Sequence, residues 1–225
     1  MTKKHFIIIF AVVVLIAGIA ILKGFWLSRG GIIINRTQVV NLNEGANFIE
    51  LNKQAGNFTV NILAKDAKTF LGNGIIVTAD GLILTSRTVV DSQKIVTIVL
   101  NDGRSFQVSP AAPDKSSDLV FLNVPAADLT VPQFDDAGSL QAGQRIAAVG
   151  RSKKLFGHKF MPGFVTNSSE AFQTDLRLDA DMIGGPLINL FGHVVALVAG
   201  PNQFILSDTL QKNLNDYLRI LQNNK

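Results

Sequence analysis

From Asn57 onward the sequence is a series of short apolar runs separated by turn-forming residues. Runs rich in valine, isoleucine and leucine that alternate with Gly, Pro, Asn and Asp are typical of strands in a β-sandwich or a β-barrel. Paired runs flank Ala79–Gly81, Asn101–Gly103 and Phe191–Gly192, which predicts three hairpins. Further strands are predicted at residues 58–64, 119–124, 144–150, 163–166 and 203–206. The sequence therefore predicts an all-β domain.

One helix is predicted, at the C-terminal end of the chain. Ser207 is a suitable N-cap residue, and the helix extends to about Gln222. Leucines recur after it at the three- and four-residue spacing of one helix face: Leu210, Leu214, Leu218 and Leu221. We expect this amphipathic helix to close the domain.

The N-terminus carries an uninterrupted apolar run from Phe6 to Leu22. In a helix this run is about 25 Å long, so we expect residues 6–27 to form a single transmembrane anchor behind a cytoplasmic tail of residues 1–5. The alternative is a cleaved signal peptide with Gly18–Ala20 as its small-residue site. Either reading places the rest of the chain outside the cytoplasm.

Composition and charge limit the classes of partner, metal site and cofactor that fit this chain. Residues 28–56 are polar and without a sustained period, so we expect a linker there and a folded domain from residue 57 to 225. The net charge of +4 is too small to favour nucleic acid as a partner. Cysteine is absent and the three histidines are scattered, so we expect no metal site and no cofactor. The basic cluster at residues 151–159 is interpreted as a solvated loop.

Four segments, taken in order, resemble the protease domain of the HtrA/Deg family. They are Gly72–Val77, Ile83–Val90, Asp114–Val120, and Phe172–Asp175 followed by Gly184–Asn189. The resemblance covers roughly residues 57 to 222. It implies a trypsin-like fold, with two six-stranded β-barrels and a C-terminal helix. Family members are commonly trimeric and often carry a PDZ domain, for which we expect no counterpart here.

The same resemblance locates the catalytic positions. Thr88 stands at the position of the catalytic histidine, Asp118 at that of the aspartate and Ile183 at that of the nucleophilic serine. In the oxyanion loop Asp181 replaces a glycine, while Gly184 is retained. The resemblance thus implies a protease framework in which only the aspartate of the triad is present.

The residues present do not support serine-protease chemistry. Such an enzyme needs a hydroxyl nucleophile, an imidazole base, a carboxylate that orients the base, and amide donors for the oxyanion. Isoleucine offers no nucleophile and threonine no base near neutral pH. We expect Asp118 to accept hydrogen bonds from Thr88 or from nearby amides, and Asp181 to repel a developing oxyanion. His158 is the one histidine placed where it could act as a substitute base, and even then no nucleophile is present.

Three functions fit this sequence. The leading hypothesis is a membrane-anchored pseudoprotease that binds an extended peptide or a partner protein by its groove. The alternative is an active serine-type endopeptidase of envelope protein quality control with non-standard catalytic residues. A third is a structural domain that lends oligomer contacts to an active relative. Peptide hydrolysis distinguishes the second hypothesis from the other two.

Overall fold

The computed structural model describes residues 44–91, 93–111, 118–151, 157–168 and 171–223. The chain divides into two units, Met1–Asn41 and Leu42–Lys225, and every described residue belongs to the second. The expected anchor at 6–27 lies outside the described residues. Within the part that the structure describes, no helix is long and apolar enough to cross a membrane.

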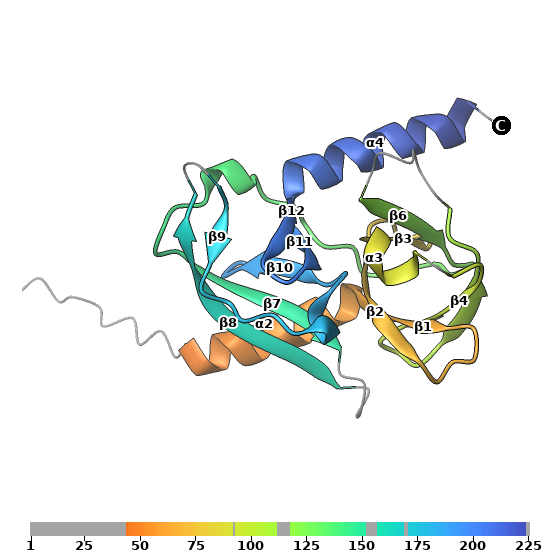
Figure 1. Cartoon of the computed structure of the whole chain (residues 1–225), viewed down its shortest axis with the longest axis horizontal. Coiled ribbons are helices and arrows are strands. Elements are labelled where there is room, and N and C mark those ends of the chain that lie inside the picture. Colours follow the sequence, from red (N-terminus) through yellow and green to blue (C-terminus); the bar gives the residue numbers. More distant parts are fainter. Residues whose placement is uncertain (1–43, 92, 112–117, 152–156, 169–170, 224–225) are drawn as a thin grey trace, which may run out of the picture. The chain divides into compact units, whose positions relative to one another are not determined.

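The second unit is built from two six-stranded antiparallel sheets (Figure 1). The first sheet has the order β5-β4-β1-β2-β3-β6. Its strands are β1 (Thr59–Ala64), β2 (Phe70–Ile76), β3 (Leu82–Ser86), β4 (Val96–Val99), β5 (Ser105–Val108) and β6 (Leu119–Asn123). The one-turn helix α3 (Arg87–Val90) directly follows β3. The predicted hairpins across Ala79–Gly81 and Asn101–Gly103 are confirmed by the pairing of β2 with β3 and of β4 with β5.

The second sheet has the order β12-β11-β10-β7-β8-β9. Its strands are β7 (Arg145–Arg151), β8 (His158–Asn167), β9 (Gln173–Thr174), β10 (Pro186–Asn189), β11 (Val194–Gly200) and β12 (Gln203–Leu206). Two short 3-10 helices, η1 (Ala137–Ser139) and η2 (Ala180–Met182), precede β7 and β10. The sheets and their hairpins confirm the all-β prediction.

Two apolar cores stabilise the domain. The larger core contains the buried side chains of the first sheet, including the completely buried Phe121, and continues into the second sheet through Val149, Ile188 and Leu197. The smaller core lies within the second sheet. The C-terminal helix α4 (Ser207–Asn223) starts directly after β12 and extends to β6 (Figure 1). There the ring of Tyr217 stacks on that of Phe121, with 4.2 Å between the ring centroids. This helix confirms the predicted amphipathic segment. Its leucine face joins the larger core through Leu210, Leu214 and Leu218.

The folded unit begins earlier than the sequence predicted. Residues 44–56, expected in the linker, form most of helix α2 (Glu44–Phe58). Leu51, Ala55 and Phe58 are buried in the larger core, so this helix is part of the domain. The helix was missed because glycine and asparagine, which are weak helix formers, interrupt its apolar stripe. Its stability comes from packing against the sheets, which local sequence does not reveal.

Candidate functional site

The position expected for a catalytic base is at the start of α3. Thr88 follows β3 by two residues and its side chain is exposed. Its hydroxyl donates to the carbonyl oxygen of Ala199, at the end of β11, over 3.1 Å. The hydroxyl of Ser86 lies 2.9 Å from that of Thr88 and 3.3 Å from the same carbonyl oxygen. Two hydroxyl protons can serve only two of these three contacts at once. The position expected for the base is therefore occupied by a hydroxyl pair that joins the two sheets.

Asp118 lies beside this pair because of the register of the first sheet. Ser86 of β3 is opposite Leu119 of β6, so Arg87, which follows Ser86, meets Asp118, which precedes Leu119, at the same end of the sheet. Accordingly, the amide of Arg87 donates to the carbonyl oxygen of Asp118 over 2.7 Å. The Asp118 side chain is exposed, and no hydrogen bond or ion pair to its carboxylate is found among the described residues. The expected bond from Thr88 to Asp118 is not formed, since the Thr88 hydroxyl is directed to Ala199 instead.

The position expected for a nucleophile is in the turn between η2 and β10. Ile183 follows η2 and its side chain packs against the larger core. A Cβ atom placed on Gly72 of β2 would lie 2.8 Å from Cγ2 of Val89 and 2.9 Å from the carbonyl oxygen of Ile183. This glycine therefore lets α3 and the Ile183 turn approach the same point of β2. The structure thus brings the three expected triad positions together at the junction of the sheets.

The turn does not present a free oxyanion hole. In serine proteases the amide of the nucleophile and the amide two residues before it point at the developing oxyanion. Here the Ile183 amide donates to the carbonyl oxygen of Ala180 over 3.2 Å, within the 3-10 turn. Asp181, at the second position, is part of the same turn and is half-buried. Gly184 adopts a φ of +82°, and its amide donates a hydrogen bond to the carbonyl oxygen of Val198 in β11. This amide is therefore engaged with the sheet.

A buried asparagine that sequence reasoning did not single out holds this turn. The side chain of Asn73 is completely buried in β2. Its Nδ2 donates to the carbonyl oxygens of Asp181 and Ile183 over 2.7 and 3.2 Å. Its Oδ1 accepts from the amide of Arg151 over 2.8 Å. A polar residue between two glycines in an otherwise apolar strand was the available signal, because a buried amide has to find partners.

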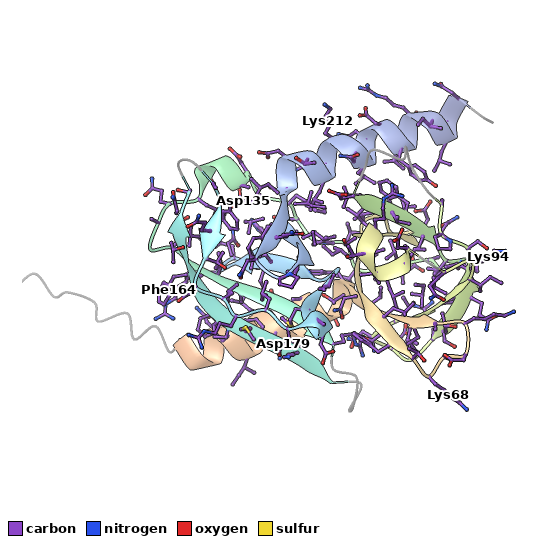
Figure 2. The ribbon with its side chains drawn as sticks, in the orientation of Figure 1. Lys68, Lys94, Asp135, Phe164, Asp179 and Lys212 are labelled. Atoms are coloured by element: carbon purple, nitrogen blue, oxygen red, sulfur yellow. The ribbon has the colours of Figure 1, made fainter. Side chains whose placement is uncertain are left out.

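Arg151 shows that the basic cluster is not wholly a solvated loop. Its side chain is only 4% exposed, and its Nη1 donates to Oδ1 of Asn101 over 3.2 Å. Burial lowers the pKa of the Arg151 guanidinium from its usual value. Lys159 forms an ion pair with Asp179, whose exposed side chain is labelled in Figure 2. The interpretation of the cluster as solvent-exposed charge is therefore wrong for Arg151.

His193, the histidine whose side chain is described, does not complete a catalytic centre at Thr88. His158 begins β8, and its side chain is outside the described part of the structure. His193 lies in the β10–β11 turn with its Nδ1 3.7 Å from Oδ2 of Asp135. It lines a cavity of about 310 Å³ with Phe191 and residues of α2, away from Thr88. His5 belongs to the undescribed N-terminus. Across the described ranges, no group of three or more His, Asp or Glu side chains is arranged to hold a metal ion.

Comparison with known proteins agrees with this architecture. The family model for the trypsin-like peptidase domain matches residues 72–197. A probable periplasmic serine endoprotease, DegP-like, of Marinomonas sp. (strain MWYL1) is 31% identical over 139 residues, which are 58% of this chain and 29% of that protein. The protein of the same description from Hahella chejuensis (strain KCTC 2396) is 33% identical over 135 residues, 56% of this chain and 29% of the relative. The match thus spans less than a third of the length of these relatives.

A solved structure supports the fold independently. The crystal structure of Deg5 superposes with a TM-score of 0.65 and 22% sequence identity, covering 76% of this chain and 93% of that one. This likeness confirms the expected arrangement of two β-barrel sheets followed by a helix.

Proposed function

This chain belongs to the trypsin-like peptidases, of the HtrA/Deg type, and we propose that it is a member that binds polypeptide segments without cleaving them. One observation carries the proposal. The hydroxyl at the position of the base is bonded to the carbonyl oxygen of Ala199, while the position of the nucleophile holds isoleucine. Isoleucine and a threonine hydroxyl at these two positions do not provide the nucleophile and imidazole base of a serine protease.

The altered turn supports the same conclusion. Stabilising a tetrahedral intermediate requires amide N–H groups that are free and aimed at the oxyanion. The Ile183 amide is instead engaged with Ala180, and the carboxylate of Asp181 belongs to the same turn. A negative charge close to a developing oxyanion raises the energy of the transition state. The scaffold of a protease is thus retained around a site that lacks its chemistry.

We place this domain outside the cytoplasm, anchored by residues 6–27. The relatives are named as periplasmic proteins, which agrees with export of the domain. The apolar run from Phe6 to Leu22 is long enough to act as the anchor. A trimer, as the family resemblance implies, remains a prediction that light scattering of the detergent-solubilised chain can test.

Reversion of the site tests the proposal. The full chain in mild detergent is compared with the triple variant Thr88→His, Asp181→Gly, Ile183→Ser for casein cleavage and for labelling by a serine-directed fluorophosphonate. We expect the natural chain to be inert and the triple variant to be labelled, because the variant regains a base and a nucleophile and loses the carboxylate beside the oxyanion. The matched control is Thr88→His with Asp181→Gly, which lacks the serine and should stay unlabelled.

Two further results decide between the hypotheses. Casein binding by the natural chain, measured by fluorescence anisotropy, is expected under the binding function and not under a purely structural role. Cleavage by the natural chain that Asp118→Ala abolishes would instead show an active endopeptidase with non-standard residues, and the binding-only proposal would then be wrong.

A further inference from the structure

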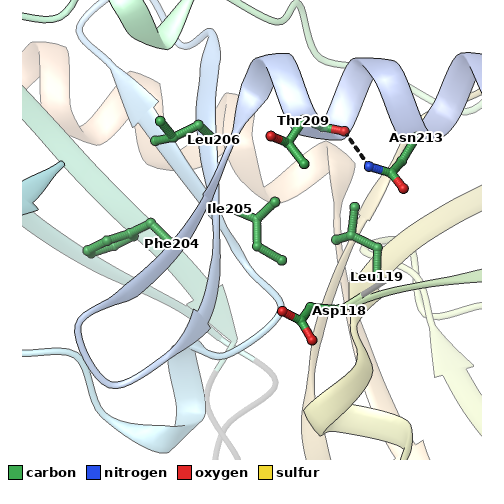
Figure 3. Close-up of a pocket in the computed structure, with 7 residues that line it drawn as sticks. All are labelled: Asp118, Leu119, Phe204, Ile205, Leu206, Thr209 and Asn213. Atoms are coloured by element: carbon green, nitrogen blue, oxygen red, sulfur yellow. Dashed lines mark hydrogen bonds between the residues drawn. The ribbon is translucent and has the colours of Figure 1, made fainter. Parts of the chain in front are cut away.

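A pocket of about 430 Å³ lies directly beside the retained aspartate. It is enclosed by the start of β6, by β12 and by the first two turns of α4 (Figure 3). Alternation along β12 sends Phe204 and Leu206 into the smaller core, whereas Ile205 packs on the side of the larger core. Figure 3 shows Ile205 on one side of the space, facing Asp118 and Leu119 on the other. Its volume is within the range of ligand-binding pockets.

Among the described residues that line this pocket, the charge is negative. Asp118 is the charged residue among the described residues that line it, and the other polar ones, Thr209 and Asn213, are neutral. Within the described chain, ion pairs of 4 Å or less join Arg104 to Asp102, Lys159 to Asp179 and His193 to Asp135, and none reaches Asp118.

Two of the described cations, Arg87 and Lys212, lie near this carboxylate and form no ion pair with it. Arg87 contacts Asp118 through its backbone amide, and its guanidinium forms no ion pair with that side chain. Lys212, in the turns of α4 above the pocket, is exposed and points away from the sheets (Figure 2). Among the described residues, the carboxylate of Asp118 is therefore available as an acceptor at the edge of an apolar space.

We propose that this pocket binds a lysine or arginine side chain of the polypeptide that occupies the domain. The aliphatic stem of such a side chain would pack on Ile205 and Leu119, and its cationic head would pair with the carboxylate of Asp118. Long basic side chains characteristically combine an apolar stem with a charged end, which matches this lining. An acidic side chain would be repelled, and a purely apolar one would leave the carboxylate unpaired. The inference rests on the proposed binding function and specifies the chemistry of the partner.

Chemical modification of an unfolded protein tests this preference. Fluorescein-labelled casein is used in three forms: unmodified, with its lysines acetylated, and with its lysines guanidinated. Acetylation removes the positive charge, whereas guanidination retains it on a planar head group. We expect the full chain to bind the unmodified and guanidinated forms alike and the acetylated form roughly threefold to fivefold more weakly, as for one accessible ion pair. Salt at about 0.5 M should reduce this difference by screening.

Variants assign the effect to the pocket. Asp118→Asn keeps the shape of the side chain and removes its charge, so the variant should bind all three forms with similar affinity. Asp128→Asn removes the same charge from an exposed position outside the pocket and should keep the full preference. A preference that survives in Asp118→Asn, or its absence in the natural chain, overturns the cation site while casein binding itself still supports the proposed function. If no form of casein binds, the proposed function fails and the cation site fails with it.

Discussion

Replacing Asn73 with alanine should destabilise the domain by about 3 kcal/mol. The substitution removes the partner of the Asp181 carbonyl oxygen and of the Arg151 amide. The carbonyl oxygen of Ile183 is less affected, because it also accepts from the Asn73 backbone amide over 2.8 Å. Two buried backbone groups are then left without a partner, at roughly 1–3 kcal/mol each. Water that enters the vacated space can replace part of these hydrogen bonds, so the expected loss lies in the lower part of the combined range.

Unfolding of the full chain in detergent, followed by circular dichroism during a thermal scan, measures this effect. For a domain of this size, about 3 kcal/mol corresponds to a decrease in melting temperature of roughly 6–12 °C. Asn123→Ala is the matched control, since Asn123 is exposed at the end of β6 and should change stability by less than about 0.5 kcal/mol. If the two variants melt at the same temperature, Asn73 does not hold the turn and the interpretation given above is wrong.

Three further outcomes are expected. Gly184→Ala should destabilise the domain by at least about 3 kcal/mol, because the added Cβ atom would lie 2.0 Å from the carbonyl oxygen of Asn73. The control is Gly103→Ala, where φ is also positive (+89°) but the surrounding space is open. This control should lose only about 1–2 kcal/mol in the same melting assay. Thr88→Val and Ser86→Ala should each lower the free energy of unfolding slightly, and the double variant should lower it by more than their sum, because both hydroxyls contact the same carbonyl oxygen. A double-mutant cycle by denaturant unfolding measures this coupling, and simple additivity would contradict it. The pKa of Asp66 is lowered by hydrogen bonds from the backbone amides of Lys68 and Thr69. The stability that the Asp66 carboxylate contributes is therefore present above the pKa of the unfolded chain and is lost as the pH falls below about 4. We expect Asp66→Asn to lose less stability in acid than the natural chain does.

Much of the fold could be predicted because its signals are local. Hairpins such as that across Asn101–Gly103 are specified by adjacent turn residues and by the apolar runs that flank them. The leucine spacing after Ser207 likewise identifies α4 without knowledge of the sheets. Helix α2 lacked such a signal, because only its contact with the larger core stabilises a segment rich in glycine and asparagine.

The candidate site, like the fold, could be predicted only in part. The sequence, through its family resemblance, predicts that Thr88 and Ile183 stand at the positions of the base and the nucleophile, and the chemistry of each side chain follows from the residue itself. It did not identify what the Thr88 hydroxyl bonds to, since its acceptor is 111 residues away in the chain.

What the sequence by itself determined is therefore the class of fold and the identity of the residues at the expected catalytic positions. Only the tertiary structure decided that Asn73 holds the altered turn, that Arg151 is buried and that the pocket between β6, β12 and α4 is lined by Asp118, which has no ion pair among the described residues. These features depend on where distant segments meet when the two sheets pack together. Periodicity and turn residues describe each segment alone, so they carry no information about the surfaces that face one another across the domain.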